Sequence, residues 1–420
     1  MDFLCCKVFD RAVVIILVSL LRGVVDGMRK ILFASIMAVF FLSGCISLFS
    51  PWNWTVKVRG SFQFSSPVAG QNGKIYAATS EDLYAFTGTG TASVVYSIGA
   101  GEWFSCDPSI DENGDIYIGT TGGRLLKISP TGNLIWSFPD QQRQDDWTVR
   151  GDPSFDNAGN VYYGDANGTL YCLTPDGTEL WSFDTGKEIW SKPAIDNDGT
   201  AYFGTLVTGS NEKHRLYAVK DGLSVWSVET LGSSAGFYSS PALGDGGNIY
   251  AASHDGYLYS IDSEDGSINW SLQVAPAFTG GDSGIASSPV VASDGTIYLC
   301  TNEGNLYSVS PGGEILWSRA LKTTIFSTPV ISSEGLIYLV DWHEARLFVL
   351  STAGDISKKP GGGSNSGGSP LMTADGTLHF LSTLNDIGTW SQLVSFKTNG
   401  EPSGEWPMFG FDQRRSGYSK

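Results

Sequence analysis

Residues Ala286–Arg319 read ASSPVVASDGTIYLCTNEGNLYSVSPGGEILWSR and form the clearest copy of a unit that recurs eight times in the chain. In most copies two small residues precede a proline, and in each copy a turn then ends on a glycine and an Ile-Tyr-type segment follows. A second turn leads to a Leu-Tyr-type segment, and most copies close on Trp-Ser. With the proline as origin, the copies begin at Pro67, Pro108, Pro153, Pro193, Pro241, Pro289, Pro329 and Pro370.

The spacing inside the unit is constant. A glycine stands six places after every proline, and a tyrosine stands nine places after it in seven copies, with His379 in the eighth. The copies follow one another at intervals of 40 to 48 residues and contain short strand-like segments joined by turns. Such a period indicates one four-stranded blade per copy. We therefore predict an all-β fold, an eight-bladed β-propeller of four-stranded antiparallel blades.

The two ends of the repeat array predict how the ring closes. Residues Trp52–Val58 read WNWTVKV, in which Trp54-Thr55 resembles the closing Trp-Ser of a copy that has no beginning. The copy that begins at Pro370 lacks a normal closing strand. We expect the N-terminal strand to complete the last blade, because closure also protects strand edges that otherwise pair with other chains.

Length and charge narrow the class of protein. The 420 residues include 52 glycines and carry a formal net charge of −17. This acidity argues against a nucleic-acid partner, since phosphate groups would be repelled. A repeat array of this length forms one large body, so residues 54–420 are expected to be one monomeric propeller.

The N-terminal residues carry the pattern of an export signal. Residues 1–27 hold an apolar run too short for a membrane span, and we interpret them as a mis-assigned leader. Residues 28–44 have a basic start, an apolar stretch and a small-residue end, the pattern of a signal peptide. Residues 42–45, LSGC, resemble the lipobox of bacterial lipoproteins. That resemblance implies lipidation of Cys45 and a tether over residues 45–53. It also implies an exported protein held at the outer membrane where a cell has one, or otherwise at the outer face of the plasma membrane.

Cysteines and acidic turns give no sign of a metal or cofactor site. Cys106, Cys172 and Cys300 occupy columns where other copies place small residues, so we interpret them as small core residues. Asp-rich turns such as residues 111–114 lack the alternating ligands and distant glutamate of a calcium loop. We interpret them as ordinary turns between strands. No catalytic residue, cofactor or metal is predicted.

Two copies carry insertions. Residues 206–214 extend the fourth copy, and residues near 383–389 extend the eighth. Insertions in propellers map to surface loops, often on a binding face. Residues 358–368 read KKPGGGSNSGG and predict a flexible loop or hinge.

The repeat pattern SP…DGxIY…GxLYxIxPxGxxxWS resembles that of the pyrroloquinoline-quinone-type propeller family. Residues Trp406–Gly417 resemble the WPxFxxDxxxxG element of the same family. The resemblance extends over most of the chain from Trp54 and implies the propeller fold. It leaves function open, because the family contains quinone-dependent dehydrogenases and also non-catalytic scaffolds. Among the scaffolds is the propeller lipoprotein of the outer-membrane β-barrel assembly machinery, which is similar in size, anchoring and repeat number.

Three functions stay open on the sequence alone. We favour a non-catalytic, lipid-anchored scaffold that binds protein partners at the cell envelope. The second is a quinone-dependent dehydrogenase, but those enzymes generally carry adjacent cysteines near the cofactor, and the only adjacent pair here, Cys5-Cys6, lies in the leader. The third is a carbohydrate-binding or glycosidase propeller, suggested by 13 tryptophans, most of which the repeat explains.

One column of the repeat varies more than blade packing requires. Three places before the prolines stand Phe64, Ser105, Arg150, Trp190, Tyr238, Ala286, Phe326 and Gly367. Because the chain enters each innermost strand here, we expect these side chains at the mouth of the central channel. Exposed aromatic residues and arginine commonly dominate the energetics of protein interfaces. The predicted partner-binding face comprises Phe64, Phe104, Trp147, Arg150, Trp190, Tyr238 and Phe326; the alternative is that these aromatics only plug the channel.

Overall fold

The computed structural model describes residues 54–62, 65–142, 148–206, 213–232, 236–277, 283–361, 363, 365–384 and 390–398, without the side chains of 358–360. The leader, signal peptide, Cys45 and tether predicted above lie outside these residues, as does the Trp406–Gly417 element. Most of both predicted insertions also lies outside them.

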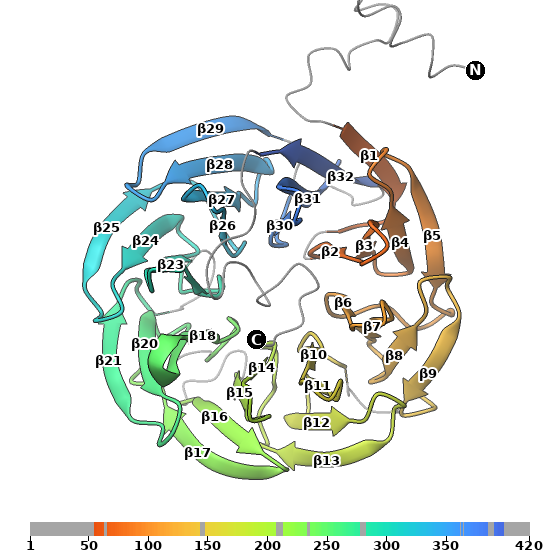
Figure 1. The fold of residues 1–420 in the computed structure, drawn as a ribbon, viewed down its shortest axis with the longest axis horizontal. Coiled ribbons are helices and arrows are strands. Elements are labelled where there is room, and N and C mark those ends of the chain that lie inside the picture. The colour runs from red at the N-terminus through yellow and green to blue at the C-terminus, as the bar shows by residue number, and fades with distance from the viewer. Residues whose placement is uncertain are drawn as a thin grey trace, which may run out of the picture. The chain divides into compact units, whose positions relative to one another are not determined.

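Eight four-stranded antiparallel sheets surround a central axis (Figure 1), which confirms the predicted eight-bladed propeller. Each of the first four blades consists of four consecutive strands, counted outward from the axis. They are β2 (Val68–Ala69), β3 (Ile75–Ala78), β4 (Asp82–Phe86) and β5 (Ala92–Ser97); β6 (Ser109–Ile110), β7 (Ile116–Gly119), β8 (Leu125–Ile128) and β9 (Leu134–Phe138); β10 (Ser154–Phe155), β11 (Val161–Gly164), β12 (Thr169–Leu173) and β13 (Glu179–Asp184); β14 (Ala194–Ile195), β15 (Ala201–Gly204), β16 (Arg215–Lys220) and β17 (Leu223–Glu229).

The next three blades repeat this order, and the fifth contains a short 3₁₀ turn, η2 (Asp245–Gly247). The eighth blade takes its outermost strand, β1 (Trp54–Arg59), from the N-terminal end of the propeller. The remaining strands are β18 (Ala242–Gly244), β19 (Asn248–Ala252), β20 (Tyr257–Asp262) and β21 (Ile268–Gln273); β22 (Val290–Val291), β23 (Ile297–Cys300), β24 (Asn305–Val309) and β25 (Ile315–Ala320); β26 (Val330–Ile331), β27 (Leu336–Val340), β28 (Arg346–Ser351) and β29 (Ile356–Gly361); β30 (Leu371–Met372), β31 (Thr377–Thr383) and β32 (Trp390–Lys397).

The pairing of β1 with β32 confirms the predicted closure of the ring. Trp54 pairs with Ser395, and the antiparallel register continues to Arg59 opposite Trp390. Val56 and Val58 are buried in the core of the last blade, because they alternate with side chains that point outward. The first strand of the propeller therefore completes its last blade.

The burial of each strand follows from its distance to the axis. In the sixth blade all four residues of β23 are buried, whereas in β25 exposed and half-buried residues alternate. A middle strand is covered by the neighbouring blades on both faces, so a continuous apolar run suits it. Burying each such aliphatic side chain contributes about 2 kcal/mol.

The repeated glycine marks a turn that requires a left-handed backbone. The eight glycines six places after the prolines all have φ between 70 and 87°. Other residues adopt this region only with strain. In the second blade the Asp111 carboxylate accepts hydrogen bonds from the backbone N–H groups of Asn113 and Asp115 and from the Tyr117 hydroxyl. The acidic turn is thereby held by its own backbone and by the column tyrosine, as the turn interpretation expects.

The repeated tryptophans join neighbouring blades. The indole N–H groups of Trp136, Trp226, Trp270 and Trp317 donate to backbone carbonyl groups 35 to 41 residues further along the chain, at 2.7 to 3.1 Å. Each acceptor lies in the turn before the outermost strand of the next blade. These side chains therefore dock on the following blade and fill the wedge between blades at the rim.

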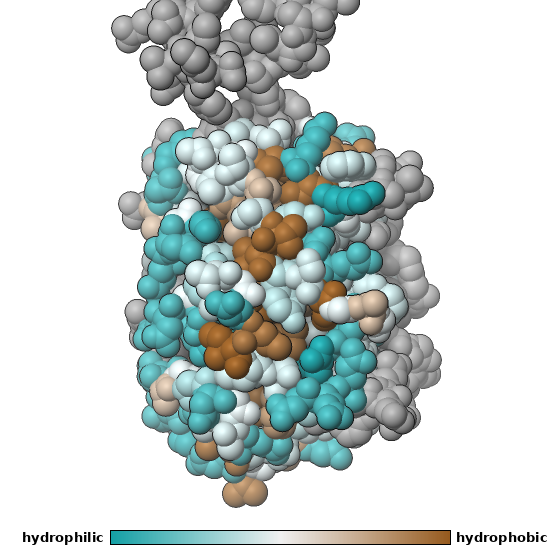
Figure 2. All heavy atoms as spheres, turned by 90° about the vertical axis from the view of Figure 1, so that its right-hand side faces the viewer, coloured by the Kyte–Doolittle hydropathy of each residue, from teal (hydrophilic) through white to brown (hydrophobic). Residues whose placement is uncertain are grey.

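The outer surface carries single aliphatic side chains among polar ones. Figure 2 views the side formed by the first two blades, where apolar side chains lie in small patches between polar ones. Val94 on β5 and Leu134 and Ile135 on β9 are among the exposed ones. Within the described residues there is no helix of the length and apolar character needed to cross a membrane.

Candidate functional site

A cavity of about 910 Å³ lies where the chain enters the innermost strands. Its wall contains every described member of the variable column, namely Ser105, Arg150, Trp190, Tyr238, Ala286, Phe326 and Gly367. Phe104 also lines it, whereas Phe64 and Trp147 lie outside the described residues. The blades therefore bring together side chains that are about 40 residues apart in sequence.

A second variable column, which sequence reasoning missed, contributes to the same wall. Thirteen places after the prolines stand Ser80, Thr121, Ala166, Leu206, His254, Asn302, Trp342 and Thr383. Four of them, Ser80, Thr121, His254 and Asn302, line the cavity directly. They begin the turns between the second and third strands, which lie at the same end of each blade as the start of the first strand. The variation of this column was the available signal.

Four residues from three consecutive blades form an aromatic wall along one side of the cavity. The Arg150 guanidinium lies 4.5 Å from the centre of the Trp190 ring. Trp190 meets Tyr238 edge to face with ring centres 4.9 Å apart, and Tyr238 lies 4.8 Å from the His254 ring. The Trp190 indole N–H donates to the Glu188 carboxylate at 2.6 Å, which fixes the orientation of the ring. We call Arg150, Trp190, Tyr238 and His254 the aromatic wall.

Other parts of the lining are also aromatic. Phe326 meets Trp342 edge to face at 5.4 Å, and Phe104 packs 6.5 Å from Tyr96. Trp103, next to Phe104, has 49% of its surface exposed. Its backbone N–H donates to the Thr121 hydroxyl at 3.0 Å, so the segment that carries it is fixed to the second blade. Trp103 is not among the residues predicted from the sequence, although its neighbour Phe104 is.

The aromatic wall contains titratable groups that burial keeps neutral. Burial lowers the pKa of His254 to about 4, and the Ile285 N–H donates to its Nδ1 atom at 3.1 Å. Burial and the nearby Glu188 charge raise the pKa of Tyr238, which the Arg150 charge opposes. Arg150 is the one cationic side chain among the described residues that line the cavity.

Among the described residues, the guanidinium of Arg150 has no polar partner. Its Nε atom is buried and makes no hydrogen bond, and no carboxylate lies within ion-pair distance of it in the described parts of the chain. Glu188 is engaged by Trp190. A buried donor without an acceptor is unusual in proteins and is costly when no ligand or water satisfies it.

A ring of hydrogen bonds runs from blade to blade next to the variable column. The residues immediately before the prolines, all within the described ranges, are Ser66, Asp107, Asp152, Lys192, Ser240, Ser288, Thr328 and Ser369. At seven of the eight junctions the backbone N–H of one donates to the side-chain oxygen of the next, at 2.7 to 3.0 Å. The last link, from Ser369 to Ser66, crosses the closure of the ring. We call these residues the inner ring. They precede the innermost strands.

Lys192 is the exception in the inner ring, because lysine has no acceptor for the preceding blade. Its side chain is fully buried, and its ammonium donates to the Ser109 hydroxyl at 2.7 Å and to the Pro153 carbonyl. The ammonium thereby lies beside Pro153, which directly follows Asp152, and beside Ser109, which follows Asp107 closely in the sequence. A positive charge therefore lies near two ring residues that carry carboxylates.

The three cysteines of the propeller are free thiols. Cys172 and Cys300 are buried, as expected of small core residues. Cys106 is only half-buried and lines the cavity, where its sulfur accepts the Gly119 N–H at 3.1 Å. Burial and the charge of Asp152 raise its pKa, so the thiol stays protonated and weakly nucleophilic.

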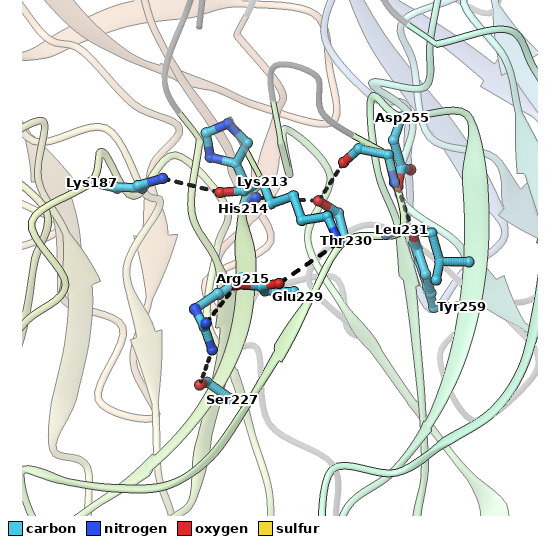
Figure 3. A network of polar contacts seen from close by, with 11 residues as sticks. Lys187, Lys213, His214, Arg215, Ser227, Glu229, Thr230, Leu231, Asp255 and Tyr259 are labelled. Atoms are coloured by element: carbon cyan, nitrogen blue, oxygen red, sulfur yellow. Dashed lines mark hydrogen bonds and ion pairs between the residues drawn. The ribbon is translucent and has the colours of Figure 1, made fainter. Parts of the chain in front are cut away.

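The base of the insertion in the fourth copy is held by a polar network (Figure 3). Lys187 donates to the Lys213 carbonyl at 3.0 Å, and Arg215 binds Glu229 at 2.6 Å. In the next blade the buried Asp255 accepts from the Gly232 N–H at 3.1 Å. Asp255 directly follows His254 in the sequence, so the network adjoins the aromatic wall.

Within the described ranges, no group of three or more His, Cys, Asp and Glu side chains is arranged to hold a metal ion. Fold and cavity define an eight-bladed propeller of the pyrroloquinoline-quinone type. The family model described as outer membrane protein assembly factor BamB matches residues 121–358, more than half of the chain. The protein therefore belongs to the BamB family, and the resemblance to pyrroloquinoline-quinone-type propellers is confirmed.

Solved structures share the fold at low sequence identity. BamB from Moraxella catarrhalis is 18% identical with a TM-score of 0.60, and the match covers 82% of this chain and 97% of that one. A europium-containing methanol dehydrogenase is 13% identical with a TM-score of 0.67, covering 83% and 93%. Quinohemoprotein alcohol dehydrogenase from Comamonas testosteroni is 14% identical with a TM-score of 0.65, covering 84% and 77%. No curated protein sequence matches the chain. At these identities the structural likeness shows the fold alone.

Proposed function

We propose that this protein is a non-catalytic scaffold, held at the cell envelope by a lipid on Cys45, that binds protein partners through the aromatic side chains at the cavity. The observation that carries the proposal is the contrast between columns. The tyrosine, glycine and tryptophan columns repeat because they pack blades, whereas the column at the cavity varies in size, charge and aromaticity. Variation at a position on a common wall favours recognition over packing.

Two further observations support a protein partner. Trp103, Trp190, Tyr238 and Phe326 remain at least partly exposed, and aromatic residues of this kind are enriched among interface hot spots. Membership of the BamB family also favours a role in assembly at the envelope, with one or more envelope proteins as partners.

The double variant Trp190→Ala, Phe326→Ala tests the binding face. Membranes that carry the full-length protein are solubilised, and partners are captured on the protein by affinity. We expect the double variant to lose its partner while its melting temperature falls by no more than a few degrees. The reason is that both side chains are half-buried at a cavity rather than in the core.

The matched control is Val94→Ala with Leu223→Ala, which removes two exposed apolar side chains from outermost strands. This control should keep the partner. Undiminished capture by the Trp190→Ala, Phe326→Ala variant, or its failure to fold, would show that the aromatics only plug the channel.

The tether is tested separately. Cys45→Ala should release the propeller from membranes with an unchanged melting temperature, since the cysteine precedes the repeats. Intact-mass analysis of the wild-type protein should show a chain that begins at a lipid-modified Cys45. An unmodified chain that retains residues 1–27 would contradict this part of the proposal.

A further inference from the structure

Within the described parts of the chain, Arg150 is an unpaired cation on a cavity wall made of aromatic side chains and small polar ones. Arg150 has a buried Nε atom without an acceptor and no carboxylate within ion-pair distance among the described residues. The two acidic side chains of the lining, Asp107 and Asp152, already accept backbone N–H groups of the inner ring. The missing group is therefore an acceptor, and a negatively charged one, because the guanidinium carries a full positive charge.

The surface beside Arg150 indicates which chemical group adjoins the acceptor in a ligand. Its guanidinium lies over the face of Trp190, and Trp190 and Tyr238 continue as an aromatic wall. A ligand whose carboxylate binds Arg150 therefore places its neighbouring atoms against aromatic rings. An apolar or aromatic group next to a carboxylate satisfies both features.

The access route to the cavity favours the end of a partner chain over an internal segment of it. Residues from all eight blades line the cavity, so a ligand enters along the axis of the ring. A chain end enters with the width of one extended strand, whereas an internal loop needs room for two. The volume of about 910 Å³ lies in the range typical of sites for small molecules and short peptides.

We propose that the cavity binds the carboxy-terminal residue of a partner polypeptide, with Arg150 paired to the terminal carboxylate and the side chain of that residue against Trp190 and Tyr238. This inference rests on the proposed scaffold function and names the part of the partner that the site recognises. A planar guanidinium can hold a carboxylate through two parallel hydrogen bonds, which separates a chain terminus from a neutral backbone amide.

Peptide binding to the full-length protein in detergent micelles tests the proposal. Three hexapeptides share five glycine and serine residues and end in phenylalanine with a free carboxylate, in phenylalanine amide, or in alanine with a free carboxylate. By calorimetry, we expect the first to bind at least about tenfold more tightly than either of the others, because each lacks one of the two contacts.

The variant Arg150→Met should weaken binding of the first peptide at least about tenfold and leave the amide unchanged. Arg319→Met is the matched control. Arg319 also lies over a tryptophan, with its guanidinium 5.6 Å from the Trp317 ring, but it is outside the cavity and its Nε donates to the Gly354 carbonyl at 2.9 Å. This control should bind all three peptides as the wild type does.

Equal affinity for the free and amidated peptides would overturn the inference, as would an equal loss of both in Arg150→Met. Binding of a planar aromatic carboxylate such as pyrroloquinoline quinone, without binding of any peptide, would overturn it in favour of a small molecule. If the peptides fail but the Trp190→Ala, Phe326→Ala variant still loses its partner, the scaffold function stands and only this inference falls.

Discussion

Several single residues differ from the residue type that their column of the repeat usually holds. Arg150 and Trp190 vary the column at the cavity, Lys192 interrupts the inner ring, and His379 replaces the column tyrosine. Arg150 and Lys192 each place a positive charge in a column where no other blade has one, and His379 places an imidazole where the other blades have a phenol. The consequences for stability can be measured one residue at a time.

Lys192→Met should destabilise the propeller by about 2–4 kcal/mol. The change removes the donor to the Ser109 hydroxyl and the Pro153 carbonyl, and it leaves the carboxylates of Asp107 and Asp152 without the nearby positive charge. Urea unfolding followed by tryptophan fluorescence measures the change in free energy of unfolding.

Ser240→Ala is the comparison for Lys192→Met, since it removes only the acceptor for the Lys192 N–H. It should cost about 1 kcal/mol, the usual effect of one lost hydrogen bond. Equal losses in the two variants would mean that the charge of Lys192 contributes nothing beyond its hydrogen bonds.

Acid should destabilise the protein through its buried histidines. Burial lowers the pKa of both His254 and His379 to about 4, against an ordinary value of about 6.5. The unfolded chain therefore binds protons that the folded chain excludes, and stability is complete above pH 6.5 and falls as the pH drops toward 4. Each histidine accounts for up to about 3 kcal/mol of this loss.

His379→Tyr isolates one of the two histidines, because it restores the residue that the other seven copies carry. Its melting temperature, measured from pH 7 to pH 4, should fall less steeply than that of the wild type. Identical slopes would show that His379 protonates in the folded state. If His379→Tyr abolished the loss of stability at low pH entirely, His254 would not contribute to that loss.

Among the strands, β1 is the one that closes the ring, because it is the outermost strand of a blade whose other strands lie at the far end of the chain. Its sequence alternates buried Val56 and Val58 with exposed Lys57 and Arg59. The inward face is part of the core of the last blade, and Trp54 lies against Gly90 of the first blade. A change on the inward face therefore acts at the junction where the ring closes.

Val58→Asp should destabilise the protein by about 3 kcal/mol, because it buries an unpaired carboxylate. Lys57→Asp lies one residue away on the exposed face and should change stability by less than about 0.5 kcal/mol. Thermal unfolding of both variants at pH 7 compares them. Similar melting temperatures would mean that β1 is dispensable for ring stability.

The strands and the closure of the ring were predictable because each strand is marked by residue types at a fixed short distance from the proline. A glycine six places after the proline recurs in every blade. A tyrosine nine places after the proline recurs in every blade except the last, where His379 stands instead. The location of the first variable column was predictable for the same reason. The inner ring was not, since its hydrogen bonds depend on which backbone N–H meets which side chain across two blades. The missing acceptor of Arg150 likewise depends on distances that spacing alone does not give.

At the scale of the whole molecule, one architecture supports unrelated functions. The fold is shared with a BamB protein, a europium-containing methanol dehydrogenase and a quinohemoprotein alcohol dehydrogenase, at identities from 13% to 18%. Chemistry in such folds depends on the residues around the axis rather than on the blades. Here those residues include aromatic side chains and two aspartates, and Arg150 is the one cation among the described lining residues.

The full-length protein should oxidise neither alcohols nor aldoses when pyrroloquinoline quinone and calcium are added. The reason is that the acidic side chains of the cavity lining already accept hydrogen bonds within the inner ring. Dye-linked reduction with ethanol and glucose as substrates is the measurement, with a purified quinone-dependent dehydrogenase as positive control. Turnover that requires both additions would establish an oxidoreductase in place of the scaffold.

The pairing of β1 with β32 also determines when, during synthesis of the chain, the eighth blade can form. The ribosome synthesises Trp54–Arg59 before any other strand of the propeller and its partner Trp390–Lys397 last. The Phe62 N–H bonds to the Ser391 hydroxyl across 329 residues of sequence. Contacts this distant form slowly, so a nascent chain carries an unpaired strand until translation is nearly complete. A circular permutant that begins at the turn before β2 and joins β1 directly after β32 would make the eighth blade from contiguous sequence, and it should refold faster than the natural chain.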